Sequence, residues 1–165
     1  MRFAFFVAVG ATLLLAGCAG LGEPSSEGAY QPPATTGAPV AFIRGSMIPG
    51  DSVFDGDHIG SVLMIDMKFI SVAHRSWQEP IALTPGRHDI TVAYVQSNFR
   101  GQANLKFEAI AGVTYQVQIM IPVEPLEKQR YCDLWIVNLA TSEIVSAIGH
   151  SRVSGGKTAS VFAPQ

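Results

Sequence analysis

Four histidines carry the most versatile chemistry in this chain of 165 residues, because a neutral imidazole can act as a general base or as a metal ligand. They are His58, His74, His88 and His150. No two of them have the i, i+4 spacing that places both rings on one face of a helix, as in zinc peptidases. We therefore expect surface or strand-end histidines, with His88, which follows a Pro-Gly pair, bonded to the loop backbone. A site that joins His58 to His150 would have to be assembled by the fold.

Asp51, Asp55 and Asp57 form a small acidic cluster. Counted from Asp55, the spacing imitates a calcium-binding loop, with Asp57 at position 3 and Asp66 at position 12. Position 5 is Ile59, however, and the last position holds Asp where calcium loops use a bidentate Glu. We therefore expect a solvated loop, no metal site and no cofactor.

The sequence offers little support for nucleophilic catalysis. It has no Gly-x-Ser-x-Gly and no phosphate-binding loop, and its Ser-x-x-Lys run, Ser154 to Lys157, falls in the Gly-rich C-terminal stretch. Cys132 alternates with Asp133 in a strand-like pattern, which favours a buried, small apolar residue. An intermolecular disulfide through Cys132 is the alternative. The chain is expected not to be an enzyme, and no catalytic residue is predicted.

Two predicted loops, 73–78 and 97–101, hold cationic side chains close to aromatic ones. Loops on a rigid β-domain commonly carry binding residues, and Trp and Arg are enriched at binding hot spots. The candidate binding residues in these loops are His74, Arg75, Trp77 and Arg100. In the alternative interpretation, Trp77 and Phe99 only cover the ends of the core.

The elements that must position these side chains are strands. From Asn104 to Ala109 the residues alternate, with Leu105 and Phe107 on one face and Lys106 on the other. Similar runs or short apolar segments predict further strands, and no stretch keeps a helical apolar stripe. These strands are 40–45, 58–65, 68–73, 80–84, 87–95, 113–121, 135–137 and 143–148.

Turn residues separate the predicted strands. Pro85-Gly86 and Ala111-Gly112 suit type II turns, while Asp66-Met67 and Thr141-Ser142 suit tight connections. The stretch 122–130 is expected to be a loop. Short strands at this spacing predict one all-β domain, an antiparallel β-sandwich over residues 40–153.

Charge and cysteine content exclude several kinds of partner. Eleven Lys and Arg against thirteen Asp and Glu give a formal net charge of −2. Nucleic-acid binders instead carry a basic stripe, so we expect no nucleic-acid partner. Two cysteines exclude a disulfide-rich scaffold and a multi-cysteine zinc site.

The N-terminus has the pattern of a secretory signal peptide: one cation, then an apolar run from Phe3 to Gly17. That run of fifteen residues is shorter than the roughly 20 that a spanning helix needs. Its end, Leu15-Ala16-Gly17-Cys18, resembles the lipobox of bacterial lipoproteins. The resemblance implies cleavage before Cys18, a diacylglyceryl group on its sulfur and a fatty acyl chain such as palmitate on the new amino terminus. The alternatives are an ordinary signal peptide with a chance cysteine and an uncleaved membrane helix.

Residues 18–39 are rich in Gly, Pro, Ser, Thr and Ala, and Tyr30 is their only aromatic residue. Such a segment buries too little apolar surface to offset its ordering entropy. We predict a flexible linker that spans roughly 25 Å. Residues 154–165 are predicted to form a flexible tail.

Two strand-turn-strand segments carry a second resemblance. Residues 81–92 contain Pro85-Gly86-Arg87-His88 between two apolar strands, and residues 105–115 end in Ala-Gly-Val-Thr-Tyr. Both segments resemble PEGA-type domains and small uncharacterised lipoproteins of the bacterial envelope. The resemblance implies an all-β fold and supplies no catalytic residues. The chain departs from the Asp-Gly-Lys turn of such domains, since Met67 follows Asp66.

These features together predict an envelope lipoprotein that a lipid on Cys18 anchors to a membrane. In a Gram-negative organism, Ala19 instead of Asp after the cysteine implies the outer membrane, facing the periplasm. The expected function is a non-enzymatic binding or structural module that docks on an envelope protein or a cell-wall component. The alternative is a hydrolase of envelope material whose site is assembled only in three dimensions.

Overall fold

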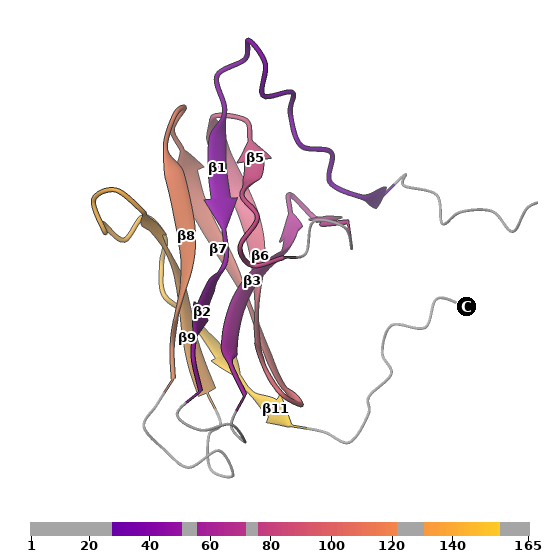
Figure 1. Cartoon of the computed structure of the whole chain (residues 1–165), viewed down its shortest axis with the longest axis vertical. Coiled ribbons are helices and arrows are strands. Elements are labelled where there is room, and N and C mark those ends of the chain that lie inside the picture. The colour runs from indigo at the N-terminus through magenta and orange to yellow at the C-terminus, as the bar shows by residue number, and fades with distance from the viewer. Residues whose placement is uncertain (1–27, 51–55, 72–75, 122–130, 156–165) are drawn as a thin grey trace, which may run out of the picture.

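The computed structural model describes residues 28–50, 56–71, 76–121 and 131–155, and these form an all-β domain, as predicted (Figure 1). Its strands are β1 (Ala41–Arg44), β2 (Ser46–Ile48), β3 (His58–Ile65), β4 (Lys68–Phe69), β5 (Ile81–Leu83), β6 (Gly86–Gln96), β7 (Phe99–Ala109), β8 (Thr114–Met120), β9 (Tyr131–Asn138), β10 (Gly149–Arg152) and β11 (Ser154–Gly155). The predicted loop 122–130 lies outside the described residues.

One predicted strand, 143–148, is wrong. This segment makes an isolated bridge between Ile144 and Val137. Beyond it, the backbone groups of Ile136 bond to the Val145 N–H and to the Ser146 hydroxyl, both at 2.9 Å. Because a side chain takes the place of a backbone partner, the ladder is interrupted before β10 begins. The predicted strand 68–73 is also too long, since β4 ends at Phe69.

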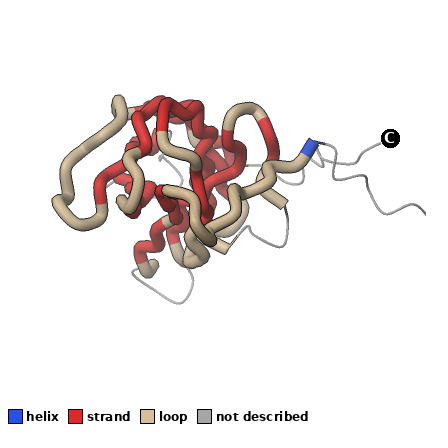
Figure 2. The backbone as a smooth tube through the Cα atoms, turned by 90° about the horizontal axis from the view of Figure 1, so that it is seen from above, coloured by secondary structure: helices blue, strands red, loops and turns tan. Residues whose placement is uncertain are grey.

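The strands form two stacked sheets, shown from the side in Figure 1 and from above in Figure 2. The first has the order β10-β9-β8-β1-β5, and the second has β11-β7-β6-β3-β2 with β4 beside β3. The paired strands are antiparallel, as predicted, except for β1 and β8, which are parallel. Both enter the sheet at the same end, where the Gly112 N–H bonds the Val40 carbonyl at 2.8 Å.

The chain crosses between the sheets at Gly45, which separates β1 of the first sheet from β2 of the second. A Cβ at this position would collide with the Gly60 carbonyl oxygen and lie 2.8 Å from the Cβ of Trp77. On the other side of the sandwich, the buried Val153 joins β10 to β11 in the same way. Crossing strands therefore close the interior at both sides.

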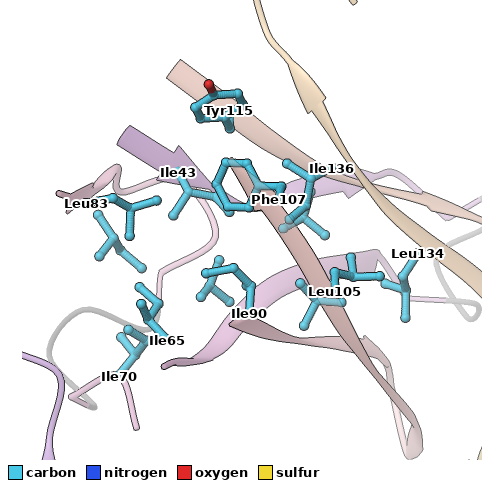
Figure 3. Packing of buried hydrophobic residues seen from close by; sticks show 14 of the residues in the cluster. Ile43, Ile65, Ile70, Leu83, Ile90, Leu105, Phe107, Tyr115, Leu134 and Ile136 are labelled. Carbon is cyan, nitrogen blue, oxygen red and sulfur yellow. The ribbon is translucent and has the colours of Figure 1, made fainter. Parts of the chain in front are cut away.

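Inward-facing residues of both sheets share one core, part of which Figure 3 shows. Leu105 and Phe107 are buried and Lys106 is exposed, which confirms the predicted alternation. Phe107 packs edge-to-face on Tyr115 with ring centroids 4.7 Å apart, a favoured arrangement for aromatic pairs. Cys132 is a buried free thiol in this core, as predicted, and burial raises its pKa to about 11.

The N-terminal side of the domain differs from the predicted linker. Ala29 pairs with Phe69 of β4, and the Tyr30 N–H donates to the Phe69 carbonyl at 2.8 Å. The Tyr30 hydroxyl donates to the carbonyl of Ala82 at 3.0 Å, and its ring packs against the core. Within the predicted linker 18–39, Ala29 and Tyr30 therefore contact the domain, whereas residues 31–39 belong to no strand. Likewise, the predicted tail begins with a paired strand, since Ser154 and Gly155 lie beside β7.

Candidate functional site

Of the four residues predicted to bind a partner, the structure describes Trp77 and Arg100. His74 and Arg75 lie outside the described residues. Trp77 is half-buried, and its carbonyl accepts the Gly45 N–H at 2.8 Å. Arg100 lies in β7 and not in a loop, because Ser97, at φ 48°, helps to close a short turn between β6 and β7. Its Nη1 donates to the Ser97 and Phe99 carbonyls at 3.0 and 3.2 Å.

Trp77 and Arg100 lie on different sides of the second sheet and are separated by its width. The register runs from Arg100 through Val95 and Ile59 to Met47, which crosses three strand pairings. At roughly 4.8 Å per pairing, about 14 Å of sheet separates β7 from β2. Trp77 contacts Gly45, the residue just before β2, so it lies near the β2 edge while Arg100 lies on β7, and a shared contact surface for the two stays a prediction.

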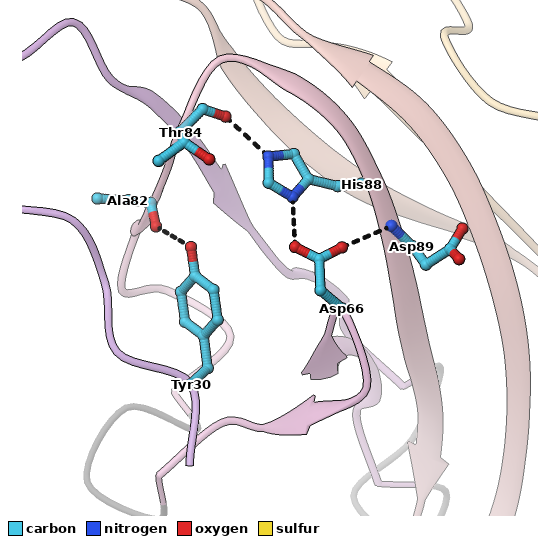
Figure 4. Close-up of polar contacts among 6 residues, drawn as sticks. All are labelled: Tyr30, Asp66, Ala82, Thr84, His88 and Asp89. Carbon is cyan, nitrogen blue, oxygen red and sulfur yellow. Dashed lines mark hydrogen bonds and ion pairs between the residues drawn. The ribbon is translucent and has the colours of Figure 1, made fainter. Parts of the chain in front are cut away.

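His88 is a structural residue, and its ring bonds the loop backbone as predicted (Figure 4). Its Nε2 lies 2.7 Å from the Thr84 carbonyl, and its Nδ1 lies 2.8 Å from Oδ2 of Asp66. Both partners are groups that accept hydrogen bonds, so the protein engages both ring nitrogens. Oδ1 of Asp66 accepts the Asp89 N–H at 3.0 Å. With both nitrogens occupied, His88 has none left to serve as a general base.

Tyr30 lies in the same corner of the domain as this pair (Figure 4). Burial, together with the negative charge of Asp66, raises the pKa of Tyr30 to about 12. The phenol is therefore neutral at physiological pH and keeps its donor for Ala82. Tyr30 fastens the N-terminal segment to β4 and β5, and the Asp66–His88 pair fastens the β3–β4 turn to β6.

A second polar cluster, which the sequence analysis missed, lies on the inner face of β6. The Tyr94 hydroxyl donates to Oε1 of Gln96 at 2.8 Å and lies 2.9 Å from Nδ1 of His58. Gln96 Nε2 lies 3.2 Å from the other ring nitrogen of His58. Tyr94 and Gln96 are fully buried. The sequence did hold one signal for this cluster. Gln96 is a polar residue two positions after Tyr94, so it lies on a strand face that is otherwise apolar.

The acidic stretch gives no metal centre within the described residues. Asp51 and Asp55 lie outside them, and Asp57 accepts the Gly50 N–H at 3.4 Å. Asp66 bonds His88 and the backbone instead of facing Asp57. Across the described ranges, no group of three or more His, Cys, Asp or Glu side chains is placed to hold a metal ion.

His150 is the histidine that faces solvent most openly among those described, with its side chain 75% exposed. Its Nδ1 lies 2.6 Å from Oδ1 of Asp133, directly across the β9–β10 pair. His58 bonds Tyr94, whereas His150 bonds Asp133. The fold therefore does not bring His58 and His150 into one site.

The His150–Asp133 pair lies on the outer surface of the first sheet, which we call the outer β9 face. Since β9 buries Cys132, Leu134 and Ile136, the alternate residues point outward. Several outward side chains here are large and apolar, with exposures of 56% for Tyr131, 54% for Met120 and 48% for Ile148. The outer β9 face consists of Gln118, Met120, Tyr131, Asp133, Trp135, His150 and Arg152, together with Ile148 just before β10.

The outer surface of the second sheet has a different chemistry. Its outward positions on β6 and β7 are mostly polar or charged, with a 2.9 Å hydrogen bond from Thr91 to Asn104 and an exposed Lys106–Asp89 ion pair at 3.5 Å. These positions include Arg87, Asp89, Thr91, Gln102, Asn104, Lys106 and Glu108. This surface is typical of a solvated face, so the outer β9 face is the better candidate for contact.

Comparison of the chain with protein-family models, with curated proteins and with solved structures finds no match. Among the described residues, no helix has the length and the apolar character needed to cross a bilayer. A functional proposal therefore has to be built from the residues and contacts of this chain.

Proposed function

We propose that this chain is a bacterial envelope lipoprotein whose all-β domain is a non-enzymatic docking module for another envelope component. The anchor is an acylated Cys18, supported by the apolar run that ends in Leu15-Ala16-Gly17-Cys18. Two or more acyl chains hold a protein stably on a membrane, whereas a single chain does not.

The observation that carries the docking role is the outer β9 face. Tyr131, Trp135 and Met120 present aromatic and apolar surface on regular strands, and the exposed Ile148 lies just before β10. Exposed apolar clusters with polar neighbours mark contact sites, and aromatic residues and Met are enriched in interface cores. Rigid strands hold these side chains without a large ordering cost on binding. The face therefore has the composition and stiffness of a docking surface.

Histidine geometry favours docking over hydrolysis. A hydrolase needs a base nitrogen that reaches its substrate and a site that excludes water. Both nitrogens of His88 are bonded to protein acceptors. His150 stands on an open sheet surface with most of its side chain in water. Water there screens the charges that a catalytic site relies on.

Photo-crosslinking in intact cells tests the proposal. A photoreactive phenylalanine analogue replaces Trp135 in the full-length chain, and the matched control replaces Gln102 on the polar face of the second sheet. We expect a discrete adduct from position 135 and none from position 102. The exposed Met120→Glu exchange should abolish the adduct while leaving the melting temperature unchanged. Equal adducts from both positions, or none from a folded and anchored position 135 variant, would contradict docking through this face.

A further inference from the structure

We infer that the hairpin of β3 and β4 contacts the phospholipid bilayer through Met67, Lys68 and Phe69. This inference rests on the proposed lipidation of Cys18. Met67 is the first reason: its side chain is 85% exposed, and its backbone has φ 64°. Turns of this kind favour Gly, Asn or Asp, because other side chains crowd the backbone there. Met67 thus satisfies neither the turn nor the core, and folding alone gives no reason for it.

Phe69 and Lys68 extend the same exposed tip. Phe69 is 42% exposed although it is aromatic, and Lys68 between the two apolar residues is exposed as well. Apolar side chains next to a cation suit the membrane interface, where the apolar groups enter the acyl boundary and the cation meets lipid phosphates. The carboxylate of Asp66, the nearest acid in sequence, is directed at His88 and the Asp89 N–H.

The hairpin is held rigidly, so its apolar tip does not fold back on the domain. Ile65 and Ile70 on either side of the tip are buried in the core. The Ile70 N–H bonds the Leu63 carbonyl at 3.0 Å, and the Asp66 N–H bonds the Asp89 carbonyl at 2.8 Å. Two buried anchors therefore fix a turn that projects Met67 outward.

The length of chain before the hairpin sets its distance from the membrane. Only residues 19–28 separate Cys18 from Ala29, and Ala29 pairs with Phe69 itself. Eleven steps at about 3.3–3.6 Å reach at most about 40 Å. The anchor therefore holds the exposed tip beside the bilayer, where even a weak contact is favoured by its high effective concentration.

The position of the hairpin also leaves the docking surface open. In Figure 1 the described chain begins on the right beside the short strand that follows β3, whereas β8 and β9 lie on the left. Figure 2 likewise shows the segment at residue 28 extending to the right of the body. A hairpin seated on the bilayer would turn the outer β9 face away from it.

Depth-dependent quenching of the full-length mature lipoprotein tests this inference. The protein is reconstituted into vesicles of phosphatidylethanolamine and phosphatidylglycerol, with a fluorophore on Met67→Cys or, as the matched control, on Gln102→Cys. Cys132 is buried and Cys18 is acylated, so labelling is selective. We expect brominated acyl chains to quench the label at 67 but not at 102, and aqueous iodide to do the reverse. Adding Phe69→Ser to the labelled Met67→Cys chain should reduce the lipid quenching.

The possible outcomes separate the two proposals. Chains that fail to float with the vesicles and carry no acyl mass overturn the lipid anchor itself. Chains that float but show equal lipid quenching at 67 and 102 overturn only the hairpin contact. Loss of iodide access at 67 without lipid quenching assigns the hairpin to a protein partner and also overturns the inference.

Discussion

Asp66 and His88, 22 positions apart in the chain, meet at 2.8 Å between Oδ2 and Nδ1. The contact joins the β3–β4 turn to the start of β6, so the residue that closes the turn is also fixed to the neighbouring strand. Because Nε2 of the same ring lies 2.7 Å from the Thr84 carbonyl, three segments are fastened by one side chain. This arrangement determines how far the tip with Met67 projects.

Removal of the Asp66 carboxyl should destabilise the domain. Asp66→Ala leaves His88 Nδ1 and the Asp89 N–H without their acceptor, at a cost of about 1–3 kcal/mol in the free energy of unfolding. Asp66→Asn should cost less, because the amide oxygen still accepts from Asp89 and its N–H can donate to a neutral ring. Denaturant unfolding of the two variants checks the order. An Ala variant as stable as the wild type would contradict the structural role.

The alternation in β7 predicts that substitutions at neighbouring residues change the free energy of unfolding by very different amounts. Phe107 is buried against Tyr115, so Phe107→Ala should cost about 3–5 kcal/mol of stability. Lys106 is exposed and forms only a surface pair with Asp89, so Lys106→Ala should change stability by less than about 0.5 kcal/mol. Thermal unfolding of both variants provides the comparison, and similar shifts in melting temperature would refute the inward placement of Phe107.

Alkaline pH should weaken the fold through Cys132. Burial raises the pKa of this thiol from 9.0 to about 11, so between these values the unfolded chain has lost a proton that the folded chain retains. Stability should therefore fall as pH rises across that window. Cys132→Ala should lower stability overall but flatten this part of the pH profile. An unchanged slope in that variant would show that other groups cause the alkaline loss.

The local sequence pattern was sufficient to predict several strands and turns. The predicted strand 58–65 coincides with β3, and Gly86 and Gly112 have the positive φ values that their predicted turns require. Period-two alternation and turn residues act over a few positions, so a single sequence contains that information. The Asp66-Met67 turn was found for the same reason.

Contacts between distant segments could not be predicted in this way. Gly45 looks like an ordinary strand residue, and only the approach of Gly60 and Trp77 shows that the chain changes sheets there. Nothing near Tyr30 in sequence indicates that its hydroxyl would reach Ala82, 52 positions away. The outer β9 face depends on register across β8, β9 and β10, which the sequence does not specify.

Both proposals depend on a lipid anchor at Cys18, and the intact mass of the mature chain shows whether that lipid is present. The protein is expressed with its own N-terminus in bacteria, purified from the detergent phase and compared with Cys18→Ser. The account predicts that the wild type begins at Cys18 and carries a diacylglyceryl group and a further acyl chain, whereas the variant retains residues 1–17 and carries no lipid. A wild-type chain without acyl mass, or one that still begins at Met1, would contradict it.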